Sequence, residues 1–567
     1  MKQTISLIIL LVLMTLSTNA QKAYLHTVGN TQQLMVEGKP FIILGGELGN
    51  SSASSAEDID RIFPKLQRMG LNTVLVPAYW DLLEPRQGQF DFSLTDKVIT
   101  TAEQYNLKVV FLWFGAWKNS MSCYAPEWFK RDFARYPRAQ TKIGKPLEIA
   151  SAFSENVFKA DNNAFGRWLT HIAEFDKNNT VIMVQIENEI GMLEDARDYS
   201  PEANEKFAQS VPAPLMKYLS DNKNTLHPTM LKKWGDNGFK MEGTWTEIFG
   251  NDIYTDELFM AYHYAIYVER MAQSARLIYN VPLYVNAAMN SRGRKPGEYP
   301  SAGPLAHLID IWRCGAPSID FISPDIYDKG FVDWTSQYKR PANPLFIPEM
   351  RLTPDNGAQA FYAIGEHEAI GVSPFSIENG SDDAQAPNVK AYRCLRELMP
   401  LLTKYQGYGY SKGLLFDMQN KERIIEDGDL KIICRHFFTL PWDARATDGS
   451  TWPEGGGIIL RIAPNEYIVA GSGIVVRFEH RTEDFEQVRL GEDGFAEVGG
   501  TNIEKGSSRW TGQRRMGIVS CDEVRVNTDG TTTYVRRLNG DEDHQGRHVR
   551  IGVDDFKVLR VKLYDYR

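Results

Sequence analysis

Two glutamates that are far apart in the chain each follow a short apolar segment. Glu189 comes after VIMVQIEN, directly behind Asn188, and Glu349 comes after PLFIP. Apolar runs of this length are typical of buried strands, so we expect both carboxyl groups at strand ends. Cleavage of a glycosidic bond requires such a pair, because one carboxyl protonates the leaving oxygen while the other stays ionised to attack the sugar or activate water.

The neighbours of the two glutamates suggest their roles. We predict that Glu189 is the acid and that the Asn188 amide binds the sugar's 2-hydroxyl group. Glu187 is the alternative acid, because it would point the same way as Glu189 if the strand stayed extended. The strand is expected to end there, which favours Glu189. Glu349 is the predicted nucleophile, and the Tyr327 phenol is predicted to donate to its carboxylate and keep it charged.

Five further residues are candidate substrate-binding groups. Glu47 and Asn286 follow predicted strands, where groups that bind hydroxyls would lie. Trp80, Trp113 and Trp117 could form the wall of a sugar pocket, and packing in the core is an equally good reading for each. Weaker candidates are Asp325, Glu127 and, as an orienting group for Glu349, Arg351.

Strand-like and helix-like segments alternate through the first 405 residues. In residues 57–69, Ile59, Ile62, Phe63 and Leu66 have the spacing of a one-sided helix. The alternation predicts a (β/α)8 TIM barrel over residues 21–405, with chemistry at the C-terminal ends of its strands. A doubly wound sheet is disfavoured, because residues 44–49 (LGGELG) lack the G-x-G-x-x-G turn. The eight predicted strands are residues 41–44, 73–76, 108–113, 181–186, 283–286, 321–323, 345–347 and 371–375.

The two ends of the chain differ from the barrel region. From residue 406 to residue 567, short alternating runs replace the helical period, which predicts an all-β, sandwich-like domain. Residues 1–20 combine Lys2, an apolar stretch and small residues before Gln21, the pattern of a cleaved signal peptide. We therefore expect a periplasmic or secreted protein that does not insert into a membrane.

Charge and cysteine content limit the classes of partner. The formal net charge of −9 argues against binding to nucleic acid. The five cysteines contain no C-x-x-C pair and no zinc-ligand spacing, so free thiols are expected rather than a disulfide framework. No metal or cofactor is predicted, and the oligomeric state stays open.

Two motifs carry a family resemblance over about residues 35–405. Residues 72–92 (NTVLVPAYWDLLEPRQGQFDF) and residues 185–191 (QIENEIG) resemble glycoside hydrolase family 35, a family of β-galactosidases in the clan of retaining barrel glycosidases. Pro77, Asp81 and Leu83 depart from the family pattern, as does the third-strand segment 113–119 (WFGAWKN). The resemblance points to a divergent bacterial branch.

The resemblance implies an exo-acting retaining β-galactosidase that removes terminal galactose from plant-type oligosaccharides or polysaccharide side chains. Alternatives are a β-glucosidase, a β-xylosidase, an endo-acting enzyme, or a glycan-binding barrel without activity. In the enzyme, Glu349 would form a glycosyl-enzyme and Glu189 would act as acid and then base.

Overall fold

The computed structural model describes residues 22–566, except residues 291, 342, 441 and 483–513. The predicted signal peptide therefore lies outside the described residues. Eight parallel strands form one sheet in the order β4-β13-β12-β11-β10-β9-β6-β5, which confirms the predicted barrel. The strands are β4 (Ile43–Leu44), β5 (Thr73–Tyr79), β6 (Lys108–Phe114), β9 (Val181–Gln185), β10 (Leu283–Ala288), β11 (Phe321–Ile326), β12 (Phe346–Met350) and β13 (Gly371–Pro374).

The residues after β4 close the barrel. Glu47 forms parallel bridges to Leu75 of β5 on one side and to Phe375, just beyond β13, on the other. The Glu47 amide donates to the Pro374 carbonyl at 2.9 Å. The carboxyl of Glu47 is thereby fixed at the C-terminal end of the barrel, where the first and last strands meet.

The helices between the strands follow the predicted apolar spacing. In α1, the Ser55 hydroxyl caps the first turn by accepting from the Asp58 amide. Its face of Ile59, Ile62, Phe63 and Leu66 is buried against the barrel. Together with α1 (Ala56–Arg68), the long barrel helices are α3 (Ser93–Gln104), α5 (Glu155–Phe175), α10 (Ile253–Ile278), α13 (Asn356–His367) and α14 (Pro387–Tyr405).

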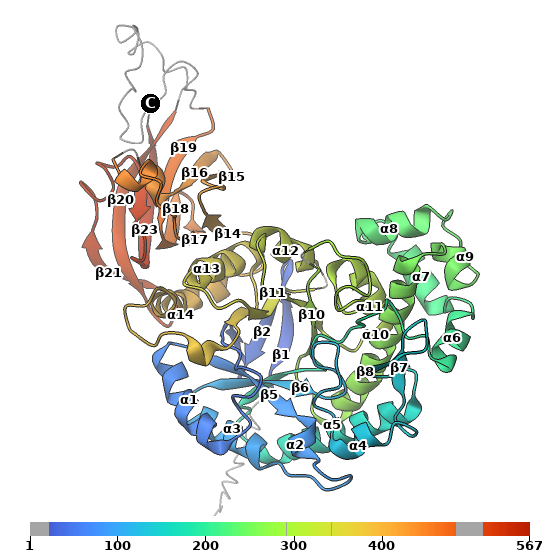
Figure 1. Cartoon of the computed structure of the whole chain (residues 1–567). Coiled ribbons are helices and arrows are strands. Elements are labelled where there is room, and N and C mark those ends of the chain that lie inside the picture. Colours follow the sequence, from blue (N-terminus) through green and yellow to red (C-terminus); the bar gives the residue numbers. More distant parts are fainter. Residues whose placement is uncertain (1–21, 291, 342, 441, 483–513, 567) are drawn as a thin grey trace, which may run out of the picture.

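Long insertions follow the third, fourth and fifth barrel strands. The insertion after β9 builds a helical lobe at one side of the barrel (Figure 1). The shorter elements of the insertions and connections are α2 (Trp80–Leu83), α4 (Glu127–Arg131), β7 (Arg138–Gln140), β8 (Pro146–Ala150), α6 (Pro201–Phe207), α7 (Ala213–Asp221), α8 (Pro228–Gly235), α9 (Trp245–Phe249), α11 (Ile309–Gly315) and α12 (Phe331–Tyr338). Within the described residues, no helix is both long and apolar enough to cross a membrane.

The C-terminal region is a two-sheet β-domain. One sheet has the order β14-β17-β18-β23-β20-β21 and the other β15-β16-β19-β22, with an apolar core between them. The strands are β14 (Ser411–Phe416), β15 (Glu422–Asp427), β16 (Leu430–His436), β17 (Gly455–Ala463), β18 (Glu466–Ser472), β19 (Ile474–His480), β20 (Arg515–Val526), β21 (Thr532–Arg537), β22 (Val549–Ile551) and β23 (Lys557–Tyr566). All five cysteines are free thiols, as predicted.

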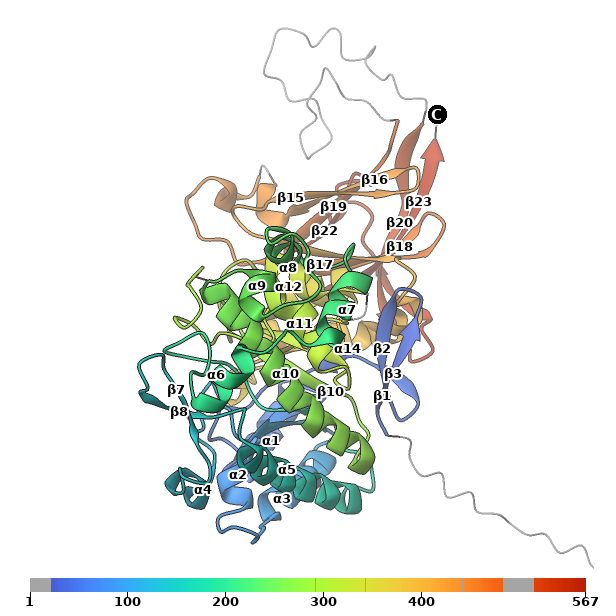
Figure 2. The ribbon, with the colours of Figure 1, turned by 90° about the vertical axis from the view of Figure 1, so that its right-hand side faces the viewer.

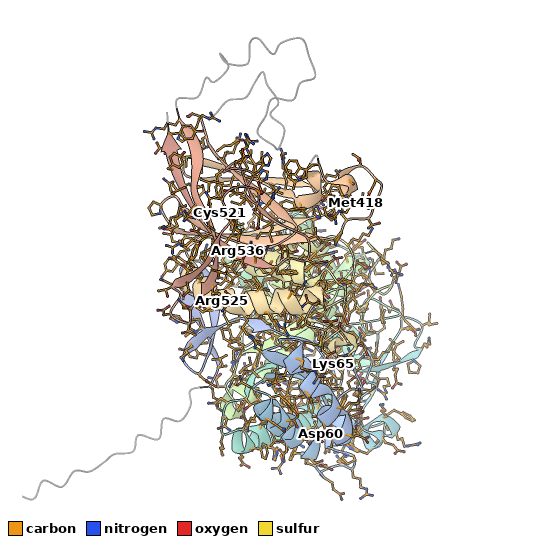
Figure 3. All side chains as sticks on the ribbon, turned by 90° about the vertical axis from the view of Figure 1, so that its left-hand side faces the viewer. Asp60, Lys65, Met418, Cys521, Arg525 and Arg536 are labelled. Carbon is orange, nitrogen blue, oxygen red and sulfur yellow. The ribbon has the colours of Figure 1, made fainter. Side chains whose placement is uncertain are left out.

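The β-domain packs directly on helices α13 and α14 of the barrel (Figure 1). Two glycines allow the backbones to meet: a Cβ on Gly456 would lie 2.4 Å from the Ala358 Cα, and one on Gly413 would lie 2.4 Å from the Tyr362 carbonyl oxygen. Figure 3 views this junction from the side, with Arg525 of β20 and Lys65 of α1 labelled on the two domains. The two domains therefore share a tight boundary.

A small N-terminal sheet completes the boundary. It comprises β1 (Tyr24–Val28), β2 (Thr31–Val36) and β3 (Lys39–Phe41), and it lies beside α14 (Figure 2). The Gln33 side chain donates to the Thr403 carbonyl of α14 at 2.8 Å. The Asn30 amide donates to the Gly407 carbonyl, in the connection between the barrel and the β-domain.

Candidate active site

The two predicted catalytic glutamates meet at the C-terminal end of the barrel. Glu189 follows β9 and Glu349 lies in β12. One carboxyl oxygen from each of them and one from Asp325 of β11 all lie within 4.8 Å of one another. Exposure of these residues is only 5% for Glu189, 3% for Glu349 and 1% for Asp325. We call these three residues, together with Glu47, the carboxyl cluster.

Backbone geometry separates Glu187 from Glu189. Both residues have left-handed backbones, with φ of 58° and 46°, so the chain is not extended there. The Glu187 carboxylate turns away from the cluster and accepts the amides of Trp117 at 2.7 Å and Ala116 at 3.3 Å. Glu189 alone enters the cluster, where it accepts a hydrogen bond from the Asn119 side chain.

Asn286 and Asp325 hold the backbone behind the acid. Asn286 of β10 accepts the Glu189 amide at 2.9 Å through its side-chain oxygen. Its side-chain nitrogen donates to Asp325 at 2.7 Å. Asn286 therefore supports the turn that carries Glu189. It lies at a strand end, as the sequence predicts for a substrate-binding candidate.

Tyr327 contacts Glu349 as the sequence predicts. Its phenol donates to Glu349 Oε1. The other oxygen, Oε2, is buried and has no hydrogen-bond partner within the described part of the chain. Arg351 does not touch Glu349 directly: its guanidinium donates to the Tyr327 carbonyl at 2.8 Å. Glu127 lies on the surface and pairs with Arg131.

Sequence reasoning missed Lys118 and Asn119, in the loop after β6. Lys118 is 3% exposed, and its ammonium donates to the Asn188 side-chain oxygen at 2.7 Å. Asn119 holds Glu189 from the same loop. The segment 113–119 stood out in the sequence only as a departure from a family pattern. The available signal was two polar residues in the loop that follows the predicted strand 108–113.

Burial and mutual repulsion raise the pKa of most acids in the cluster. Burial, and then the nearby charge of Glu349, raises the pKa of Glu189 to about 7. The same two causes, in the same order, raise the pKa of Glu47 and of Asp325 well above the usual range. Burial alone would lower the pKa of Lys118, but the surrounding carboxylates, Glu349 first, raise it. Burial and mutual repulsion thus favour the protonated form of these three acids, beside one buried ammonium group.

A second pair of buried acids lies behind the site. Asp161 of α5 accepts from the Trp113 indole at 2.9 Å and from the Tyr267 phenol at 2.7 Å. Burial, and then Asp161, raises the pKa of Glu187 well above its usual range. Since Glu187 accepts the amides of residues 116 and 117, this pair anchors the start of the loop that carries Lys118.

The three tryptophans pack in the core rather than against the carboxyl cluster. Trp80 donates to Glu84 at 2.9 Å and packs on Trp128 and Phe129. The ring of Trp113, whose nitrogen bonds Asp161, packs on Phe165 and Trp168 of α5. The ring of Trp117 meets Tyr264 and Tyr267 of α10. All three side chains are fully buried among these neighbours, an arrangement that favours the core-packing alternative.

The cluster also has donors suited to a cation. Glu189, Asp325 and Glu349 could each offer one oxygen to the same ion. Lys118 already supplies a positive charge to these carboxylates. The positive charge of Lys118 therefore partly balances the negative charge of the cluster. Glu189 and Glu349 can together perform acid–base and nucleophilic chemistry.

Two family models match separate parts of the chain. Residues 50–249 match the glycoside hydrolase family 42 model, described as "Beta-galactosidase". The matched segment is therefore similar to a glycoside hydrolase domain. The match includes Glu189 and ends before Glu349. It supports the β-galactosidase type of domain, and the narrower resemblance to family 35 is not supported. Residues 389–550 match a family described as "Domain of unknown function (DUF5597)", which begins inside α14.

Curated relatives match over part of the barrel. A "Beta-galactosidase" of Xanthomonas manihotis is 26% identical over 206 residues, which is 34% of this chain and 31% of that protein. "Beta-galactosidase-1-like protein 3" of Mus musculus is 30% identical over 174 residues, 29% of this chain and 24% of that protein. The matched region thus spans a third or less of the length of these relatives.

Solved structures of β-galactosidases are more distant. The enzyme from Rahnella sp. R3 has a TM-score of 0.45 at 14% identity, covering 68% of this chain and 58% of that one. The enzyme from Marinomonas ef1 has a TM-score of 0.41 at 14% identity, covering 64% and 60%. At these values the likenesses add nothing to what the chain's own sheet order and side-chain contacts establish.

Proposed function

We propose that the protein is an exo-acting retaining β-galactosidase that hydrolyses terminal β-galactosides. The observation that carries this proposal is the approach of the Glu189 and Glu349 carboxyls in a closed polar cluster. Retaining glycosidases hold their two carboxyl groups about 5–5.5 Å apart, whereas inverting ones leave about 6.5–9.5 Å for a water molecule. One oxygen of Glu189 and one of Glu349 lie within 4.8 Å of each other, which favours the closer, retaining spacing.

The contacts of the two acids support their separate roles. In the first step, Glu349 attacks the anomeric carbon through Oε2 while Tyr327 holds Oε1. Glu189, whose pKa is raised to about 7, gives its proton to the leaving oxygen. In the second step Glu189 takes a proton from water, and the water oxygen displaces Glu349 from the sugar. The sugar is released with its original anomeric configuration.

The sugar and the mode of action rest on different support. Galactose is the proposed sugar because the matching family and relatives are β-galactosidases. Exo action follows from burial, because a cluster with a few per cent exposure suits the end of a glycan chain better than an open cleft does. Two further parts complete the proposal. The leader-like residues 1–20 support export to the periplasm or beyond. The resemblance of the sequence motifs is the reason for proposing plant-type polysaccharide as the source of galactosides.

The test is hydrolysis of a panel of nitrophenyl β-glycosides by the wild-type protein and the Glu349→Gln variant. We expect release from the galactoside and no release by the variant. Proton NMR of the first sugar released should show the β-anomer, and an initial α-anomer would contradict the retaining mechanism. Release from a glucoside or xyloside alone would keep the mechanism and change the sugar. Binding of galactosides without hydrolysis would favour the glycan-binding alternative.

A further inference from the structure

Lys118 is a buried cation that none of the proposed catalytic steps uses. It lies in the loop after β6, and its ammonium donates to the Asn188 side-chain oxygen at 2.7 Å. Lysine is rarely buried to this degree without paired acids. The acids that surround Lys118 are Glu349, Glu189, Glu47 and Asp325.

The loop that carries Lys118 is held in place from two sides. Residues 117–120 run alongside residues 188–189: the Asn188 amide donates to the Trp117 carbonyl, and the Ser120 amide donates to the Glu189 carbonyl at 3.1 Å. On the other side, the Trp117 ring is held between Tyr264 and Tyr267. The loop is thus attached both to the strand that carries the acid and to helix α10.

The bond from Lys118 decides which way the Asn188 amide faces. An ammonium group can only donate, so it must take the oxygen of the carboxamide. The nitrogen, Nδ2, then points elsewhere, and it is buried with no hydrogen-bond partner among the residues that the structure describes. A buried amide nitrogen of this kind is a donor prepared for a ligand oxygen.

We propose that Lys118 is a positioning residue for the glycosidase reaction and acts through Asn188. The ammonium fixes the carboxamide so that its nitrogen donates to a hydroxyl of the bound sugar. This inference rests on the proposed function, because it requires a sugar beside Glu189. The charge of Lys118 has a second consequence, since it opposes the rise in the pKa of Glu189.

A double-mutant cycle tests the coupling between the two residues. Lys118→Met and Asn188→Ala should each lower kcat/KM by about 10- to 100-fold, the range for lost hydrogen bonds to charged or buried groups. Because both remove the same sugar contact, the double variant should fall within about threefold of the worse single variant. A loss equal to the product of the two single losses would overturn the proposal.

The pH profile separates positioning from simple support of the fold. Lys118→Met should move the basic limb of kcat/KM to higher pH, because it removes the charge that lowers the pKa of Glu189. Asn188→Ala should leave that limb in place. Lys118→Gln keeps a donor without the charge, so it should shift the limb while restoring most of kcat/KM. It is also the variant to measure if Lys118→Met does not fold.

The matched control is Lys145→Met, which removes an exposed lysine that pairs with Glu194. It should leave both kcat/KM and the pH profile unchanged. A wild-type protein without glycosidase activity would overturn the proposed function, and this inference with it. An active wild type with unaltered Lys118→Met kinetics would overturn this inference alone.

Discussion

Two groups of buried acids lie near the end of β9, and they differ in how many of their carboxyl oxygens accept a hydrogen bond. In the pair Glu187 and Asp161, every carboxyl oxygen accepts a donor from the chain. In the carboxyl cluster, Glu349 Oε2, Glu47 Oε1 and Asp325 Oδ1 are buried without a partner in the described part of the chain. Proteins rarely leave buried polar atoms unpaired. We therefore interpret the pair Glu187 and Asp161 as structural and the carboxyl cluster as a site for a ligand.

Removing the proposed nucleophile should have the largest effect. Glu349→Gln should lower kcat on a nitrophenyl galactoside by more than about 1,000-fold, the scale on which loss of a covalent nucleophile acts. Its melting temperature should stay the same or rise, because the variant removes a poorly bonded buried acid. Steady-state kinetics and thermal unfolding measure the two quantities. A fully active variant would exclude Glu349 as nucleophile.

Disrupting the fully bonded pair should instead cost stability. Glu187→Ala leaves the amides of residues 116 and 117 without their acceptor, at about 1–3 kcal/mol for each buried group. We expect the free energy of unfolding to fall by about 2–5 kcal/mol, measured by urea denaturation. Glu187→Gln, which retains one acceptor oxygen, serves as the milder control. Unchanged stability of Glu187→Ala would contradict the contrast between this pair and the carboxyl cluster.

The hydrogen bond from Tyr327 should contribute less than the nucleophile itself. Tyr327→Phe removes the donor to Glu349 Oε1 and keeps the ring. Loss of a hydrogen bond to a charged group is worth about 1.5–3 kcal/mol, so kcat/KM should fall about 10- to 100-fold. Exchange of the exposed Tyr254 of α10 for Phe is a suitable control. Wild-type kinetics for Tyr327→Phe would mean that Glu349 needs no such support.

The smallest expected effect is a gradual change of kcat/KM with pH. The acid must be protonated to donate, and the pKa of Glu189 is raised to about 7. Activity should therefore be present below that pH, and kcat/KM should fall about tenfold per pH unit above it. A pH series on a nitrophenyl galactoside measures the limb, which reports the coupled pair rather than Glu189 alone. In Glu189→Gln the limb should disappear.

The sequence predicted the positions that a strand end defines. An apolar run, followed by a polar residue, located Glu189, Glu349, Glu47 and Asn286 at the C-terminal end of the barrel, because that is where barrel strands deliver side chains. The choice between Glu187 and Glu189 also followed from the expected end of the strand. The left-handed backbone at both residues is the physical reason why they point apart.

The residues that the sequence missed depend on loop geometry. Lys118 and Asn119 reach the cluster only because their loop pairs with residues 188–189, a contact between distant segments that no local pattern encodes. The tryptophans were ambiguous for a related reason. Alternation along a strand says that Trp113 faces one side, but not whether that side is the barrel interior or helix α5. The structure places it against α5.

The boundary between the barrel and the β-domain determines whether the β-domain can be replaced by protein engineering. Gly456 and Gly413 bring β17 and β14 within backbone contact of α13, so the helix surface is shaped for this one partner. Helix α13 starts a few residues after Glu349, so a shift of the helix would reach the active site. The β-domain therefore cannot be exchanged for another domain without changing the surface of α13. Grafting the barrel onto another accessory module would require a new surface for α13 to be designed at the same time.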